Sequence, residues 1–142
     1  MNNTELTKKV HQAVASQCQT RGYATVVDVL MDIGILSKQN YNNWRNGKVA
    51  YLEQVCNANL SKLALVLKEI RVRARQSNLT PSLTSYNRSG KKSGPSALRF
   101  SKSGQQSIEN QYATHFLDRK RIAELKELKD NAKAKEVGQQ SV

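Results

Sequence analysis

The sequence predicts a mainly α, α+β domain with a helix-turn-helix or winged-helix-like arrangement, one basic β-hairpin and a charged C-terminal tail. Three observations predict this class. Apolar residues recur every three or four positions in the segments before residue 77. Residues 82–101 have a centre rich in Gly, Ser and Pro between two short apolar segments, which is typical of a hairpin. From residue 118 onward there is no aromatic residue. We therefore expect a single domain over 1–117, with its hairpin around 82–101, and a tail over 118–142 that is partly helical or disordered.

The first three expected helices each follow a capping residue and end at a glycine. The expected caps are Asn3 or Thr4, Thr25, and Ser37. The expected stops are Gly22, Gly34 and Gly47. Two further helices are predicted. A long one covers about 51–76, where apolar residues form a continuous stripe, and a closing one covers 108–116.

Positive charge is concentrated in one stretch of the chain. The whole sequence has 23 Lys and Arg against 11 Asp and Glu, a formal net charge of +12. Between Lys68 and Lys102 there are nine basic residues and one acid, Glu69. Such a stretch is typical of a surface that binds the phosphates of nucleic acid. The candidate phosphate-binding residues are Lys68, Arg71, Arg75, Arg88, Lys91, Lys92, Arg99 and Lys102.

The expected third helix carries amides of the kind that read base edges. Asn and Gln can pair with adenine, and Arg with guanine. The candidate base-reading residues are Gln39, Asn42, Asn43 and Asn46. An ordinary solvated helix surface explains the same amides equally well, and both interpretations stay open.

Six residues around the third helix are expected to be structural. Tyr41 and Trp44, three positions apart, are expected to be core anchors, and Trp44 and Tyr51 bracket the turn at Gly47. Glu53 could accept hydrogen bonds from free helix N–H groups or pair with Arg45. If Arg45 forms that pair it is structural, and otherwise it is free to read a base.

Enzyme and metal chemistry find little support. Ser89 to Ser93 lacks the glycine and the Lys-Ser/Thr order of a phosphate-binding loop. Cys18 and Cys56, with two histidines, do not give zinc spacing and are expected to be core residues. We therefore expect no enzyme activity, no metal and no cofactor. No apolar run is long enough to span a bilayer and no signal-peptide pattern is present, so a cytoplasmic location without a membrane partner is expected.

Five sequence blocks carry a resemblance. They are GYATVVDVL at 22–30, YNNWRNGKVAYLE at 41–53, NLSKL at 59–63, LRFSKSG at 98–104 and IENQYATHF at 108–116. They resemble a family of small uncharacterised bacterial proteins over about residues 22–117. The resemblance implies that helices and hairpin form one unit and that the tail is an appendage. It implies no activity or ligand.

The sequence thus favours a non-enzymatic nucleic-acid-binding protein, with DNA preferred, that uses a basic helix end and a hairpin wing. Two alternatives remain open. One is an RNA-binding protein, since loops rich in Arg, Lys and Ser also serve RNA. The other is an interaction adaptor that docks an acidic partner. A homodimer or a protein partner could use the C-terminal tail.

Overall fold

The computed structural model describes residues 1–89 and 97–140, with side chains up to residue 135. The elements in chain order are α1 (Asn3–Arg21), β1 (Tyr23–Thr25), α2 (Val26–Asp32), α3 (Lys38–Arg45), the short 3-10 helix η1 (Leu52–Val55), α4 (Leu60–Gln76), β2 (Thr80–Leu83), α5 (Gln106–Ala113), β3 (Thr114–Leu117) and α6 (Arg119–Gln140). The predicted mainly helical α+β class is confirmed.

Side-chain caps begin the first three helices. Asn2 caps α1 by accepting a hydrogen bond from the Glu5 N–H at 2.8 Å, so α1 begins earlier than expected. Thr25 accepts from the Asp28 N–H at 3.0 Å, and Ser37 accepts from the Asn40 N–H at 3.1 Å, as predicted. Each cap satisfies an N–H that has no partner within its own helix.

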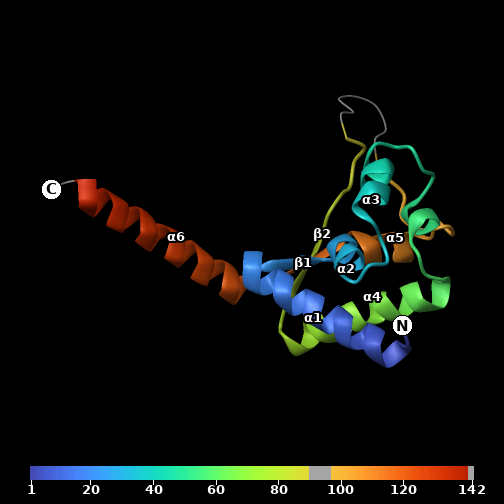
Figure 1. Cartoon of the computed structure of the whole chain (residues 1–142), viewed down its shortest axis with the longest axis horizontal. Coiled ribbons are helices and arrows are strands. Elements are labelled where there is room, and N and C mark those ends of the chain that lie inside the picture. The colour runs from blue at the N-terminus through green and yellow to red at the C-terminus, as the bar shows by residue number, and fades with distance from the viewer. Residues whose placement is uncertain (90–96, 141–142) are drawn as a thin grey trace.

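A three-stranded antiparallel sheet has the order β1, β3, β2 (Figure 1). Phe116 in the central strand β3 lies opposite Ala24 of β1 and Pro81 of β2. The prediction that 114–116 continue the closing helix is wrong. These residues pair with a strand on either side, and pairing with residues distant in sequence overrides the local helical pattern.

The apolar core lies between α1, α2, α4 and the sheet, and α1 packs against α4. Its fully buried side chains include Leu6, Val10, Val14, Val29, Leu30, Leu63, Val66 and Ile70. These positions recur at the three- and four-residue spacing that predicted the helices.

The long helix starts at Leu60 and not near residue 51 as predicted. The Leu52 and Glu53 N–H groups donate to the carbonyls of Arg99 and Phe100, at 3.1 and 2.9 Å. Asn59 then caps α4 by accepting from the Lys62 N–H at 2.9 Å. Residues 51–59 therefore pack as η1 and extended chain, because their N–H groups are used by a segment distant in sequence.

The predicted hairpin exists only in part. Strand β2 pairs with β3 and not with the segment after residue 96. The two expected arms do meet through one antiparallel bridge, Asn87 with Ala97, and the Leu98 N–H donates to the Tyr86 carbonyl at 2.9 Å. The predicted basic tip, with Lys91 and Lys92, lies outside the described residues.

Helix α6 extends away from the rest of the described chain (Figure 1). Its start is fixed to the end of α1. The Asp118 N–H donates to the Gly22 carbonyl at 2.7 Å, and Arg121 Nε donates to the Gln19 carbonyl at 2.9 Å. The described part of the tail is thus one helix over residues 119–140, more regular than the partly helical or disordered tail that the sequence predicts.

Candidate nucleic-acid interface

One face of α3 is held in the core by Trp44. This side chain is fully buried, and its ring centroid lies 5.2 Å from that of Phe100 and 5.5 Å from that of Tyr86. Its Nε1–H donates to the Arg99 carbonyl at 2.8 Å. Trp44 is therefore a core anchor, which leaves it unavailable as a stacking platform for a base.

The opposite face of α3 presents amides to solvent. Gln39, Asn42 and Asn46 are exposed, whereas Asn43 is half-buried. Lys38 and Lys48 are exposed at the two ends of this face, and residues 38–48 contain no acidic side chain. Three of the four candidate base-reading residues can therefore be reached by a ligand, and the segment that carries them has no negative side chain.

The structure brings Arg88 to this face. The Ser89 N–H donates to the Arg45 carbonyl at 2.7 Å, which fixes the segment before residue 90 to the end of α3. The Arg88 side chain lies over Gly47, where an added Cβ would be 2.9 Å from Arg88 Cδ and Nε. Gly47 has a φ of +75°, which favours glycine for a second reason. Arg88, which is exposed, thus lies at the C-terminal end of α3, over the residue that follows Asn46.

Arg45 is held by aromatic rings. Its Cζ lies 5.5 Å from the centroid of the Tyr86 ring and 6.0 Å from that of Tyr41. Its Nη1 donates to the Tyr41 hydroxyl at 3.4 Å. Of the two alternatives for Glu53, the pair with Arg45 does not form, because a different segment lies against Glu53.

That segment is residues 99–104, which two carboxylates fix in place. Glu53 accepts from the Lys102 N–H at 2.8 Å and from the Tyr112 hydroxyl at 2.7 Å. Glu109 accepts from the N–H groups of Phe100 and Ser101, at 2.9 and 2.7 Å. Together the two glutamates satisfy backbone donors at three successive residues of this loop.

Arg99 is also used within the loop. Its Nε donates to the Ser101 carbonyl at 2.7 Å, and its Nη2 donates to the Lys102 carbonyl. Its Cζ lies 5.5 Å from the centroid of the Tyr51 ring. These contacts make Arg99 a structural residue of the loop and occupy two of its donor nitrogens. The Lys102 side chain is exposed.

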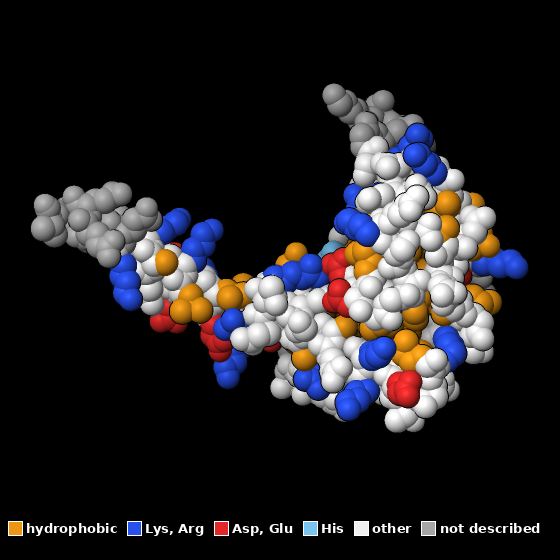
Figure 2. Space-filling view, in the orientation of Figure 1, with side chains coloured by type: hydrophobic (Ala, Val, Ile, Leu, Met, Phe, Trp, Pro, Cys, Tyr) orange, Lys and Arg blue, Asp and Glu red, His pale blue; other side chains and the backbone are white. Residues whose placement is uncertain are grey.

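The remaining candidate cations lie on α4. Lys68 and Arg75 are exposed, and Arg71 is half-buried and donates from Nη1 to Gln111 Oε1 at 2.7 Å. In Figure 1, α3 lies at the upper end of the folded part and α4 along its lower edge. In the view of Figure 2, Lys and Arg side chains lie at the upper and lower ends of the folded part and along α6. The candidate phosphate-binding residues that the structure describes therefore do not gather in one patch. Arg88 lies beside α3, and Lys68, Arg71 and Arg75 lie on another element.

Buried acids in this region favour their protonated forms. Burial, together with the negative charge of Glu53, raises the pKa of the Cys56 thiol to about 12. Burial and the hydrogen bond to Glu53 raise the pKa of Tyr112 well above its ordinary value. A thiol that stays protonated is a poor nucleophile. Cys18 is buried as expected, and Cys56 is half-buried in the segment between η1 and α4.

The described residues contain neither a cluster of metal ligands nor a membrane-spanning helix. In that part of the chain, no three His, Cys, Asp or Glu side chains lie close enough to hold a metal ion. None of the helices over 1–89 and 97–140 is long and apolar enough to cross a bilayer.

Sequence reasoning missed Glu109 and the loop that it holds. Its only signal is the LRFSKSG block, whose Ser and Gly residues indicate a turn without naming a partner. Lys48 was also missed as a member of the α3 face, although its place after Gly47 could have indicated it.

Comparison of the chain with protein-family models, with curated proteins and with solved structures gives no significant match.

Proposed function

We propose that the protein is a non-enzymatic nucleic-acid-binding protein, with DNA favoured over RNA, and that it binds through the exposed face of α3. The observation that carries this proposal is the position of Arg88 over Gly47, directly after α3, the helix that carries the exposed amides of Asn42 and Asn46. A protein that recognises a nucleic-acid sequence needs a cation close to a helix with exposed amides. The cation neutralises phosphate, and the amides can pair with base edges.

The order of elements supports a helix-turn-helix. Helices α2 and α3 are short, consecutive and joined by residues 33–37. In such motifs the second helix enters the major groove. Burial of Trp44 holds α3 to the core by one side, which leaves Gln39, Asn42 and Asn46 free for bases on the other.

The test measures binding to a duplex DNA and to a structured RNA over a series of salt concentrations. Each phosphate contact contributes about 0.9 to the slope of log affinity against log salt on duplex DNA. We expect Arg88→Ala to weaken binding and to lower this slope by up to that amount. The pair Lys91→Ala with Lys92→Ala should lower it by up to about two units. A matched control is Lys129→Ala with Lys133→Ala on the exposed side of α6, which should leave the slope unchanged.

A second pair of variants tests base reading. Asn42→Ala and Asn46→Ala should reduce discrimination between DNA sequences by about 1–3 kcal/mol for each lost bidentate pair, without changing the salt slope. Parent-like binding of the Arg88 variant and of both asparagine variants would contradict the proposed interface. Tighter binding to the structured RNA than to the duplex DNA at the same salt concentration would identify RNA as the preferred ligand.

We further propose that α6 contacts a second copy or a protein partner. Ile122 and Leu128 are 38% and 58% exposed. An isolated helix in water is only marginally stable without packing, and packing of these residues would supply it. Sedimentation at increasing concentration tests this. A single monomeric species for the parent and for Leu128→Glu alike would rule out self-association through α6.

A further inference from the structure

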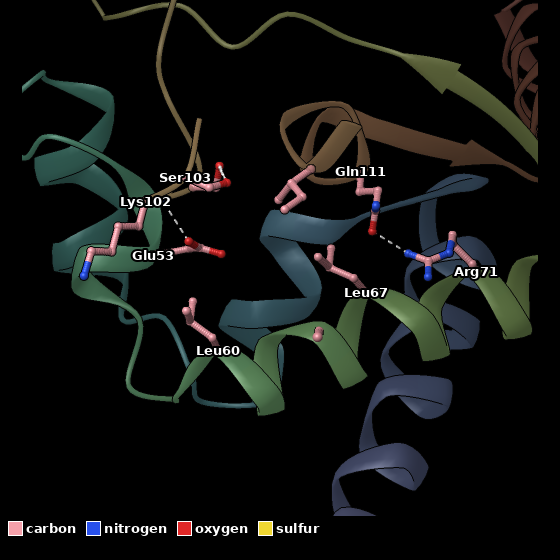
Figure 3. Close-up of a pocket in the computed structure, with 10 residues that line it drawn as sticks. Glu53, Leu60, Leu67, Arg71, Lys102, Ser103 and Gln111 are labelled. Atoms are coloured by element: carbon pink, nitrogen blue, oxygen red, sulfur yellow. Dashed lines mark hydrogen bonds between the residues drawn. The ribbon is translucent and has the colours of Figure 1, made fainter. Parts of the chain in front are cut away.

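A groove runs between α4 and α5 and reaches Glu53 of η1 and the 99–104 loop. Its larger end is a hollow of about 660 Å3 beneath the 99–104 loop, and a second hollow of about 340 Å3 continues toward β2. Both hollows are lined by Leu67, Arg71 and Gln111, so they meet at the Arg71–Gln111 hydrogen bond. Figure 3 shows Leu60 and Leu67 pointing into the larger hollow, with Glu53 at one end and Arg71 at the other.

The floor of the groove is apolar along most of α4. Leu60, Ala64 and Leu67 line the first hollow, and Ile70 and Ala74 line the second. Leu60 is 60% exposed, whereas Leu63 and Leu67 of the same helix are buried. At 1.5 Å per residue, the stretch from Leu60 to Ala74 is about 21 Å long. A helix of about 14 residues has the same length.

The rim of the groove is positive. Arg71, Arg75 and Lys102 line it, and the exposed Lys68 lies on the same helix. The carboxylate in the lining, Glu53, has both oxygens occupied by hydrogen bonds to Lys102 N–H and to the Tyr112 hydroxyl. The α4 acid Glu69 contacts His11 of α1 at 3.3 Å, on the side of α4 that faces α1. An occupant of this groove therefore needs acidic side chains at its edges.

The chain's own α6 does not meet that need. Residues 119–135 contain seven basic and three acidic side chains, so this part of the helix has a net charge of +4. In Figure 1, α6 extends away from the folded part of its own chain. A second copy's α6 would bring positive charge to a positive rim, which like-charge repulsion opposes.

We propose that this groove binds an amphipathic helix of a partner protein, with apolar residues on the α4 floor and acidic residues toward Arg71, Arg75 and Lys102. Recognition of this kind uses apolar anchors at i, i+3 or i+4, and i+7 of the bound helix. The acidic residues select the partner and speed association, while burial of its apolar face supplies most of the affinity. The lining of the α4–α5 groove and the α3 face have no residue in common.

The test uses a designed, fluorescently labelled helical peptide of about 14 residues, with leucines at the anchor positions and glutamates on the flanks. Its control peptide has lysines in place of the glutamates. Ala64→Glu places a carboxylate on the apolar floor at an exposed position of α4, and Ser61→Glu makes the same change on α4 outside the groove lining. We expect Ala64→Glu to weaken binding of the acidic peptide at least about tenfold, because an unpaired charge would be buried. Ser61→Glu should bind it like the parent.

Three outcomes would overturn the proposal. If the acidic peptide and the lysine peptide bind with equal affinity, the positive rim does not select the partner. Parent-like peptide binding by Ala64→Glu would place the peptide elsewhere. Loss of duplex DNA binding in Ala64→Glu, with a circular dichroism spectrum like that of the parent, would assign the groove to the nucleic-acid site. Because Ala64 lies outside the α3 face, failure of Arg88→Ala to affect DNA binding would leave the peptide result intact.

Discussion

Glu53 and Tyr112, 59 residues apart in the sequence, are joined by a 2.7 Å hydrogen bond in which the Tyr112 hydroxyl donates to Glu53 Oε2. The other carboxylate oxygen of Glu53 accepts from the Lys102 N–H. This residue therefore connects η1 to α5 and to the 99–104 loop. Since the Tyr112 side chain is fully buried and its pKa is raised, the hydroxyl stays protonated and remains a donor.

We predict that Glu53→Gln lowers the free energy of unfolding by about 1–3 kcal/mol, because a glutamine amide presents one acceptor oxygen to two donors. Urea denaturation measures the change. Glu127→Gln, on the exposed surface of α6, is a matched control and should stay within about 0.5 kcal/mol of the parent.

The same bond can be isolated by adding Tyr112→Phe to form a double-mutant cycle. We expect a coupling between the two positions, so that Glu53→Gln has a smaller effect when the hydroxyl is absent. Additive effects of the two substitutions would show that the hydrogen bond contributes little to stability.

Trp44→Ala should destabilise the fold by about 3–5 kcal/mol, as expected for a fully buried aromatic side chain. Trp44→Phe keeps a ring against Phe100 and Tyr86 and should lose less. The Arg99 carbonyl still accepts from the Leu52 N–H in that variant. Thermal unfolding followed by circular dichroism distinguishes the two. An unchanged melting temperature for Trp44→Ala, with loss of nucleic-acid binding, would make Trp44 a stacking platform after all.

Gly22→Ala and Gly34→Ala form a matched pair for the junction between α1 and α6. Both glycines have positive φ, +87° and +83°, so both substitutions carry the strain of a left-handed alanine, about 1–2 kcal/mol. At Gly22 the added Cβ would also lie 2.5 Å from Ile122 Cγ1, whereas nothing lies within 4 Å of the one at Gly34. We expect Gly22→Ala to lower the free energy of unfolding more than Gly34→Ala. Equal losses would mean that α6 moves away from α1 without penalty.

Stability should fall as the pH is lowered through the range in which His115 takes up a proton. Burial lowers the pKa of His115 below its ordinary value of 6.5; the charge of Arg21 adds to this and that of Asp28 opposes it. Below pH 6.5 the unfolded chain binds the proton before the folded one does, so the free energy of unfolding decreases until the lowered pKa is passed. The stabilisation of neutral His115 is complete above that range.

The measurement compares urea denaturation of the parent and of His115→Gln from pH 7.5 to pH 5, values chosen to bracket the ordinary histidine range. The difference between the two proteins should shrink as the pH falls, because only the parent loses the contribution of His115. Glutamine can still meet the Tyr86 hydroxyl, which contacts His115 Nε2 at 2.9 Å. A difference that is constant over this range would show that His115 titrates alike in both states.

Some features of the candidate surfaces could be predicted from the sequence, and others could not. The third helix, its cap at Ser37 and its buried Trp44 could all be predicted, because they depend on residues three to seven positions apart. The number of positive residues from Lys68 to Lys102 could be read from the sequence. Their distribution over different parts of the structure could not be predicted. Arg88 lies against α3, Arg99 binds carbonyls of its own loop, and Arg71 lies in the α4–α5 groove. These positions depend on how distant segments pack.

By itself the sequence determined the helical class, the caps at Thr25 and Ser37 and the apolar face of α4, since each follows from local hydrogen bonding and side-chain periodicity. Only the tertiary structure decided that β3 is a strand, that α4 begins at Leu60, and that Glu53 binds the 99–104 loop and not Arg45. In each of these cases a backbone or side-chain group had two possible partners. The choice between them depends on which distant segment packs alongside, and local sequence does not encode that proximity.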